Sequence, residues 1–181
     1  MKDNYITEVP VSKFVFANTK TAIFWLVVRI YVGWAWLQAG LHKVGDSAWT
    51  GENAGEALKG FIGGALSKTG GAHSDVTGWY AWFLEKCVLP NAEVWAQVVA
   101  WGEVLVGIAL IVGILTGIAA FFGTFMNMSF LLAGTVSSNP ILFALGTGIV
   151  LAWRVAGYIG LDRFVLPRFG TPWSPGNMFR K

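Results

Sequence analysis

Charged residues are scarce in this sequence: Asp, Glu, Lys and Arg together make up 13% of its 181 residues. A single cysteine, Cys87, excludes an internal disulfide and, with only two histidines, a cysteine-based metal cluster. Membrane haem normally needs axial ligands such as paired histidines, but His42 ends an apolar stretch and His73 lies in a polar connection. No CxxC, strand-linked GxGxxG or GxxxxGK[ST] motif occurs. We therefore predict neither a metal nor a haem.

Apolar residues take the place of the missing charges. They account for 55% of the chain, and the mean hydropathy is +0.57, well outside the usual balance of a soluble domain. About 20 apolar residues in a helix cross the roughly 30 Å hydrocarbon core of a bilayer. Four stretches approach this length, at about 21–41, 94–115, 118–136 and 141–161. The sequence predicts an all-α membrane protein, with residues 1–181 forming one domain built on a four-helix transmembrane bundle.

The flanking charges predict the orientation of these spans. Lysines precede the first span and arginines follow the last, so the positive-inside rule places both termini in the cytoplasm of a bacterial or archaeal cell membrane. The first span contains Arg29 and is too long for a signal-peptide core, so we expect a retained anchor. The net charge of +3 follows from this topology and gives no reason to expect nucleic-acid binding.

The connection of about residues 43–93 is then extracytoplasmic, and it is long for a link between packed helices. Helical spacing of apolar residues predicts one helix over Glu52–Leu66. A second is expected from Ser74 or Asp75 to Leu89, ended by Pro90 and rich in the tryptophan and tyrosine typical of membrane interfaces. This second helix is either a lid over the mouth of the bundle or a packing helix with no gating role.

Each predicted span contains one strongly polar residue: Arg29, Glu103, Asn127 and Arg154. At about 1.5 Å per residue, all four lie about 10 to 16 Å from the cytoplasmic edge, so they can form one layer. Small residues beside them suggest that they face the bundle interior. We expect Glu103 to pair with Arg29 or Arg154, leaving a positive charge that would attract an anion, a quinone carbonyl or a lipid headgroup. The alternative is an ion-pair latch that binds nothing.

At the outer end of the first span, Gln38 and His42 lie four residues apart beside Lys43. They could meet a polar ligand, although anchoring at the headgroup level is the more ordinary role.

The segments Arg29–Lys43 and Gly102–Gly113, continued to Asn127, resemble the DoxX family. The opening segment has the family's arginine, glycine and terminal AGxxK-like stretch, and the second has its glutamate-glycine core. The resemblance covers about residues 20–165. Size and the long outer connection are more similar to the DoxD small subunit of thiosulfate:quinone oxidoreductase than to the shortest members of the family. The resemblance implies a four-helix subunit that, together with a second small membrane-associated subunit, passes electrons from thiosulfate to quinone.

Two hypotheses follow. In the first, the chain belongs to a quinone-linked oxidoreductase, with a quinone headgroup held by Arg29, Glu103, Asn127 and Arg154 and an anionic sulfur substrate near His42 and Lys43. In the second, it is a non-enzymatic membrane scaffold or assembly subunit, whose aromatic connection docks a partner. A homo-oligomer is possible in either case.

Overall fold

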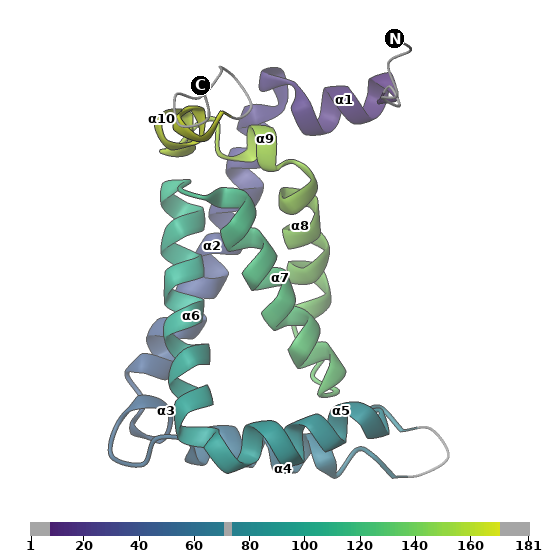
Figure 1. Cartoon of the computed structure of the whole chain (residues 1–181), viewed down its shortest axis with the longest axis vertical. Coiled ribbons are helices and arrows are strands. Elements are labelled where there is room, and N and C mark those ends of the chain that lie inside the picture. The colour runs from purple at the N-terminus through teal and green to yellow at the C-terminus, as the bar shows by residue number, and fades with distance from the viewer. Residues whose placement is uncertain (1–7, 71–73, 171–181) are drawn as a thin grey trace.

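The computed structural model describes residues 8–70 and 74–170, which contain helices and no β-strand. Four helices run alongside one another: α2 (Ala22–Val44), α6 (Ala92–Val112), α7 (Thr116–Leu132) and α8 (Asn139–Leu151), as Figure 1 shows. The segments Thr19–Val44 and Gly78–Val112 are long and apolar enough to cross a membrane, whereas α7 and α8 are shorter apolar helices. The predicted all-helical class is confirmed. Crossing by all four helices stays a prediction.

Glycines let α2 and α6 approach at backbone distance. A Cβ on Gly107 would lie 2.5 Å from the backbone nitrogen of Leu37, and one on Gly40 would lie 2.6 Å from the nitrogen of Val104. A Cβ on Gly33 would lie 3.0 Å from that of Leu110. No larger side chain fits at Gly40 or Gly107 without moving a backbone, so these positions fix how the two helices sit against each other.

A three-residue turn, residues 113–115, joins α6 to α7, whereas the predicted spans left residues 116–117 between them, and these begin α7 in the structure. Gly113 ends α6 in the left-handed region with φ of 74°, and Leu115 precedes α7 with φ of 47°. Glycine is favoured at such a helix end because it has no Cβ to clash there.

The fourth apolar stretch differs from its prediction. Helix α8 ends at Leu151, ten residues before the expected boundary, and is followed by α9 (Trp153–Ala156), α10 (Asp162–Val165) and a 3₁₀ turn (Leu166–Phe169). Leaving the regular helix frees the carbonyl of Ile159 for Arg29 and brings Asp162 to the α6–α7 turn.

The long connection forms α3 (Ser47–Thr50), α4 (Glu56–Leu66) and α5 (Gly78–Phe83). A π-helical turn (Leu84–Val88) and a 3₁₀ turn (Leu89–Asn91) lead directly into α6. Both predicted helices are therefore present, but the second continues through a bend into α6 and does not stop at Leu89. Residues 71–73, including His73, lie outside the described part.

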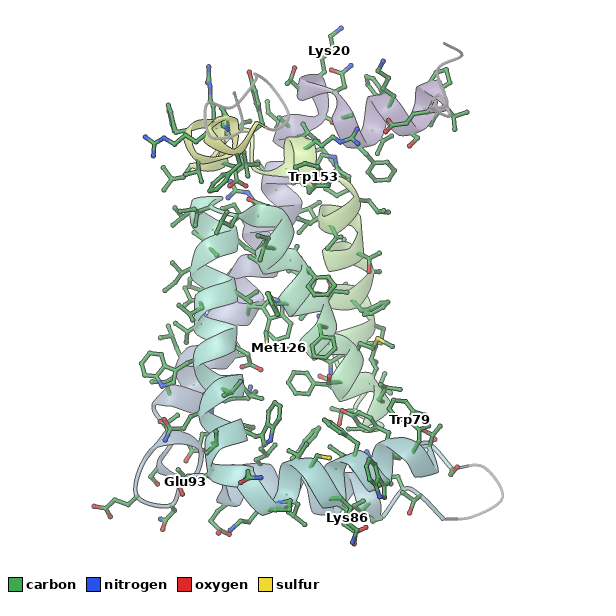
Figure 2. The ribbon with its side chains drawn as sticks, in the orientation of Figure 1. Lys20, Trp79, Lys86, Glu93, Met126 and Trp153 are labelled. Carbon is green, nitrogen blue, oxygen red and sulfur yellow. The ribbon has the colours of Figure 1, made fainter. Side chains whose placement is uncertain are left out.

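Helices α4 and α5 lie across one end of the four long helices (Figure 1). Their buried residues form a second core with the start of α6 and with Ala133. Lys68 Nζ donates to the carbonyl of Gly134 at 2.7 Å, and Tyr80 Oη donates to that of Ser129 at 2.8 Å. In Figure 2, Trp79 lies on the side of this layer toward the long helices and Lys86 on the opposite side.

The opposite end carries α1 (Pro10–Ala17), a 3₁₀ turn (Thr19–Thr21), α9 and α10 (Figure 1). The first and last described elements thus lie at the same end, consistent with termini on one side of a membrane. Which side that is stays a prediction. Three of the flanking charges used for it, Lys2, Arg180 and Lys181, fall outside the described residues.

Candidate functional site

Arg29 caps the carbonyl end of α6. It is 1% exposed, and its Nη1 donates to the carbonyls of Leu110 at 2.5 Å and Ile111 at 3.2 Å. Its Nη2 donates to the carbonyl of Ile159 at 2.8 Å. The last carbonyls of a helix have no partner within it and carry partial negative charge, which a guanidinium satisfies.

Asp162 performs the opposite task at the start of α7. Its carboxylate is completely buried and accepts from the backbone N–H of Leu115 at 2.6 Å and of Thr116 at 2.9 Å. Its own backbone N–H donates to the carbonyl of Gly113 at 2.7 Å. Arg29, Asp162 and the turn between α6 and α7 are called the hairpin lock below. Asp162 was not among the predicted site residues, because no local pattern links it to a turn that ends 47 residues before it.

Arg154 does not lie in the interior. Its side chain is 44% exposed and forms an ion pair with Glu8 at 3.0 Å, and its guanidinium lies 5.8 Å from the centroid of the neighbouring Trp153 ring. The reason is the early end of α8, which places Arg154 in α9 at the end of the molecule that also holds Lys20 and Trp153 (Figure 2). The prediction of a single layer of four polar residues is therefore wrong.

Glu103 pairs with Lys43, not with either arginine. The carboxylate is 1% exposed, and its Oε2 lies 2.7 Å from Lys43 Nζ, whose side chain is 19% exposed. From α3, the ring of Trp49 covers the ammonium at 5.2 Å. Glu103 and Leu110, whose carbonyl binds Arg29, are seven residues apart, or about 10 Å along a helix. The two buried charge groups are therefore separate.

Asn127 lies at the height of Glu103 on the facing helix. A Cβ on Gly102 would lie 3.6 Å from Met126 Sδ, and one on Gly123 would lie 3.1 Å from Val106 Cγ1, which fixes the level of α6 against α7. Met126 marks this level between the two helices in Figure 2. Since Glu103 and Asn127 are both buried and adjoin these positions, they occupy the same depth of the interior.

Neither polar atom of the Asn127 side chain has a hydrogen-bond partner among the described residues, although the residue is 0% exposed. Aromatic rings pack about one turn away from it in both directions along α7. The indole nitrogen of Trp36 faces Gly123, one turn along α7, and the Trp36 ring lies 6.4 Å from that of Phe130. Phe61 of α4 contacts Phe130 at 6.0 Å. Lys43, Glu103 and Asn127 are called the outer polar cluster below.

The charge balance of this cluster differs from the prediction. Glu103 compensates Lys43, while Arg29 is held by backbone carbonyls about 10 Å farther along α6, so no unmatched arginine lies beside Glu103. A buried amide that can both donate and accept, at the depth of a neutral ion pair, suits an uncharged ligand with a carbonyl oxygen better than an anion. Gln38 and His42 are both exposed and lie outside the cluster.

Within residues 8–70 and 74–170, no group of three or more His, Cys, Asp or Glu side chains could hold a metal ion. Residues 24–136 match the DoxX family profile. The matched region contains the whole outer polar cluster and Arg29, but ends before Arg154 and Asp162. No curated protein and no solved structure matches the chain.

Proposed function

The chain belongs to the DoxX family, and we propose that this membrane protein is a quinone-binding subunit of an oxidoreductase. In this proposal the electron donor is a sulfur compound, with thiosulfate as the first candidate and a second small subunit as partner. Two thiosulfate ions would each give up one electron and join through a new S–S bond. The quinone takes up these two electrons and two protons to become a quinol.

The observation that carries the proposal is the unpartnered amide of Asn127. Leaving a buried donor or acceptor unsatisfied costs about 1–3 kcal/mol, and apolar surroundings offer it no water. Asn127 lies at the depth of the Lys43–Glu103 pair, with Trp36 and Phe130 packed one turn away along α7, and such surroundings suit a quinone headgroup. Asn127 Nδ2 can donate to one quinone oxygen, while Trp36 and Phe130 provide apolar surface for the ring.

The other predicted ligands have different parts in this proposal. Arg29 holds the hairpin lock and so acts on the site through the position of α6. Arg154 lies outside it. An anionic sulfur compound would meet the molecule at the water-facing end near His42, because the interior cluster has no spare positive charge.

Quinone binding tests the proposal directly. The purified protein, extracted in mild detergent, is assayed for co-purified quinone and for binding of a short-chain quinone analogue by tryptophan fluorescence. Asn127→Leu should weaken binding at least tenfold, because the amide donor is lost, and Asn127→Ala should do the same without added bulk.

Thr124→Val is the matched control. Thr124 also has a buried, unpartnered hydroxyl on α7, but this hydroxyl faces Gly146 of α8 and not the cluster. The control should bind quinone as the unmodified chain does. If the folded protein binds no quinone, or if Asn127 variants bind it normally, the proposal is wrong.

The second candidate function is the scaffold. It is favoured by Trp79 and Trp82, whose side chains on α5 are 62% and 60% exposed and are available to lipid or a partner. A folded protein that binds no quinone, and whose membranes reduce no quinone analogue with thiosulfate, sulfite or sulfide in the presence of its partner, would support this candidate.

A further inference from the structure

We infer that Lys43 and Glu103 deliver the protons for quinone reduction, and that these protons enter from the end of the molecule covered by α3, α4 and α5. This inference rests on the proposed function and adds the direction of proton uptake. With the donor oxidised at the same end, each turnover would move no net charge across the membrane.

A short polar link connects the outer polar cluster to water. Lys43 is the penultimate residue of α2, and its side chain is 19% exposed, whereas Glu103 beside it is 1% exposed. A 2.7 Å contact joins the two groups. Trp49 flanks the ammonium, and the carboxylate of Asp46 nearby is engaged with the backbone N–H of Ala48. Lys43 is thus the group that connects Glu103 to the solvent.

Among the described residues, no comparable polar link leads from the outer polar cluster toward the end that carries α1 and α10. In the part of the chain that the structure describes, buried polar side chains occur at the hairpin lock (Arg29, Thr116 and Asp162) or in the outer polar cluster and at the start of α8 (Glu103, Asn127 and Asn139). About 10 Å of α6 separates the two groups. Val32, Trp36, Val106 and Leu110 are buried in the apolar core that fills this interval. The buried hydroxyl of Thr124 faces α8.

The Lys43–Glu103 pair can supply both protons that quinone reduction needs. Two electrons from the sulfur donor and two protons convert the two C=O groups of the quinone into two C–OH groups. For each proton, Lys43 protonates the Glu103 carboxylate, Glu103 transfers that proton to a quinone oxygen, and water on the α3–α5 side restores Lys43. The Lys43–Glu103 pair returns to its starting state after every transfer, as a proton relay requires.

Proteoliposomes containing the protein and its co-purified partner in one orientation test this. The vesicles expose the α3–α5 end to the outer medium and contain a short-chain quinone in the bilayer. The electron donor is added to the outer medium. We expect two protons to disappear from the outer medium per quinol when the oxidised donor releases none. A trapped pH dye and a potential-sensitive dye should show no change. Alkalinisation of the lumen, or a membrane potential, would overturn the inference and leave the proposed function standing.

Glu103→Gln supplies the second measurement. It keeps the size and a hydrogen-bonding group toward Lys43 but cannot carry the proton, so turnover should fall at least tenfold while quinone binding stays within twofold. Lys43→Arg keeps the charge but cannot release its proton, so it should retain folding and slow turnover as much as Glu103→Gln does. Thr124→Val should leave turnover unchanged. Normal turnover in Glu103→Gln would refute the relay. If none of the donors drives quinol formation by the unmodified complex, the proposed function and this inference are both wrong.

Discussion

Removing the two members of the Lys43–Glu103 pair should cost very different amounts of stability. In Lys43→Met, the carboxylate of Glu103 stays 1% exposed with no cation beside it. Breaking a buried pair in this way costs about 3–5 kcal/mol. Alternatively, Glu103 can become neutral by taking up a proton, and the loss of stability is then similar, because protonating an ordinary carboxyl group at pH 7 costs about 3.7 kcal/mol.

Glu103→Leu should be milder. The remaining Lys43 side chain is already 19% exposed at the end of α2, so it can turn its ammonium to water, and we expect a loss of about 1 kcal/mol. The double variant has neither charge and should lie within about 1 kcal/mol of the unmodified protein.

Reversible unfolding in detergent, titrated with a denaturing surfactant and followed by tryptophan fluorescence, measures these differences. Lowering the pH from 7 to 5 should reduce the loss in Lys43→Met by about 2.7 kcal/mol, because the proton that neutralises Glu103 becomes easier to obtain. Equal losses in the two single variants, or simple additivity in the double variant, would contradict the burial asymmetry.

Three further predictions concern packing, the hairpin lock and topology. Gly107→Ala should destabilise by about 1–3 kcal/mol in the same unfolding assay, because its Cβ would meet the α2 backbone. Gly63 lies within α4 with open space around it, so Gly63→Ala should leave the stability unchanged or raise it by up to about 1 kcal/mol. Equal losses of stability at Gly63 and Gly107 would contradict the packing of α2 against α6. Asp162→Ala should lose about 2–6 kcal/mol, because two N–H groups of the α6–α7 turn would be left unpaired, and an unchanged midpoint would remove Asp162 from the lock. In a cysteine-free background, Glu56→Cys should react with an impermeant maleimide on intact cells and Lys13→Cys only after lysis, and the reverse pattern would invert the predicted orientation.

Much of the helical architecture could be predicted because its causes are local. Hydropathy marks an apolar helix, and the tight turn after α6 follows from too few residues for anything longer. The two helices of the long connection were found from apolar spacing and aromatic content. The exceptions have tertiary causes: α8 ends early, and α5 continues through a bend into α6. The segment after α8 leaves the helix to contact the α6–α7 turn. The segment after α5 bends into α6 while its buried residues join those of α4 in the second core.

The sequence by itself determined the all-helical class, the apolar helices and the family, and it identified Arg29, Glu103 and Asn127 as interior residues. Only the tertiary structure decided which charges meet. Glu103 pairs with a lysine 60 residues away, Asp162 caps a helix that begins 46 residues before it, and Arg154 reaches the surface. Hydropathy depends on each residue and its neighbours, so it can be read along the chain. Partner choice depends on helix register and on where the helices end, and here glycine contacts and carbonyl capping between distant segments fix both.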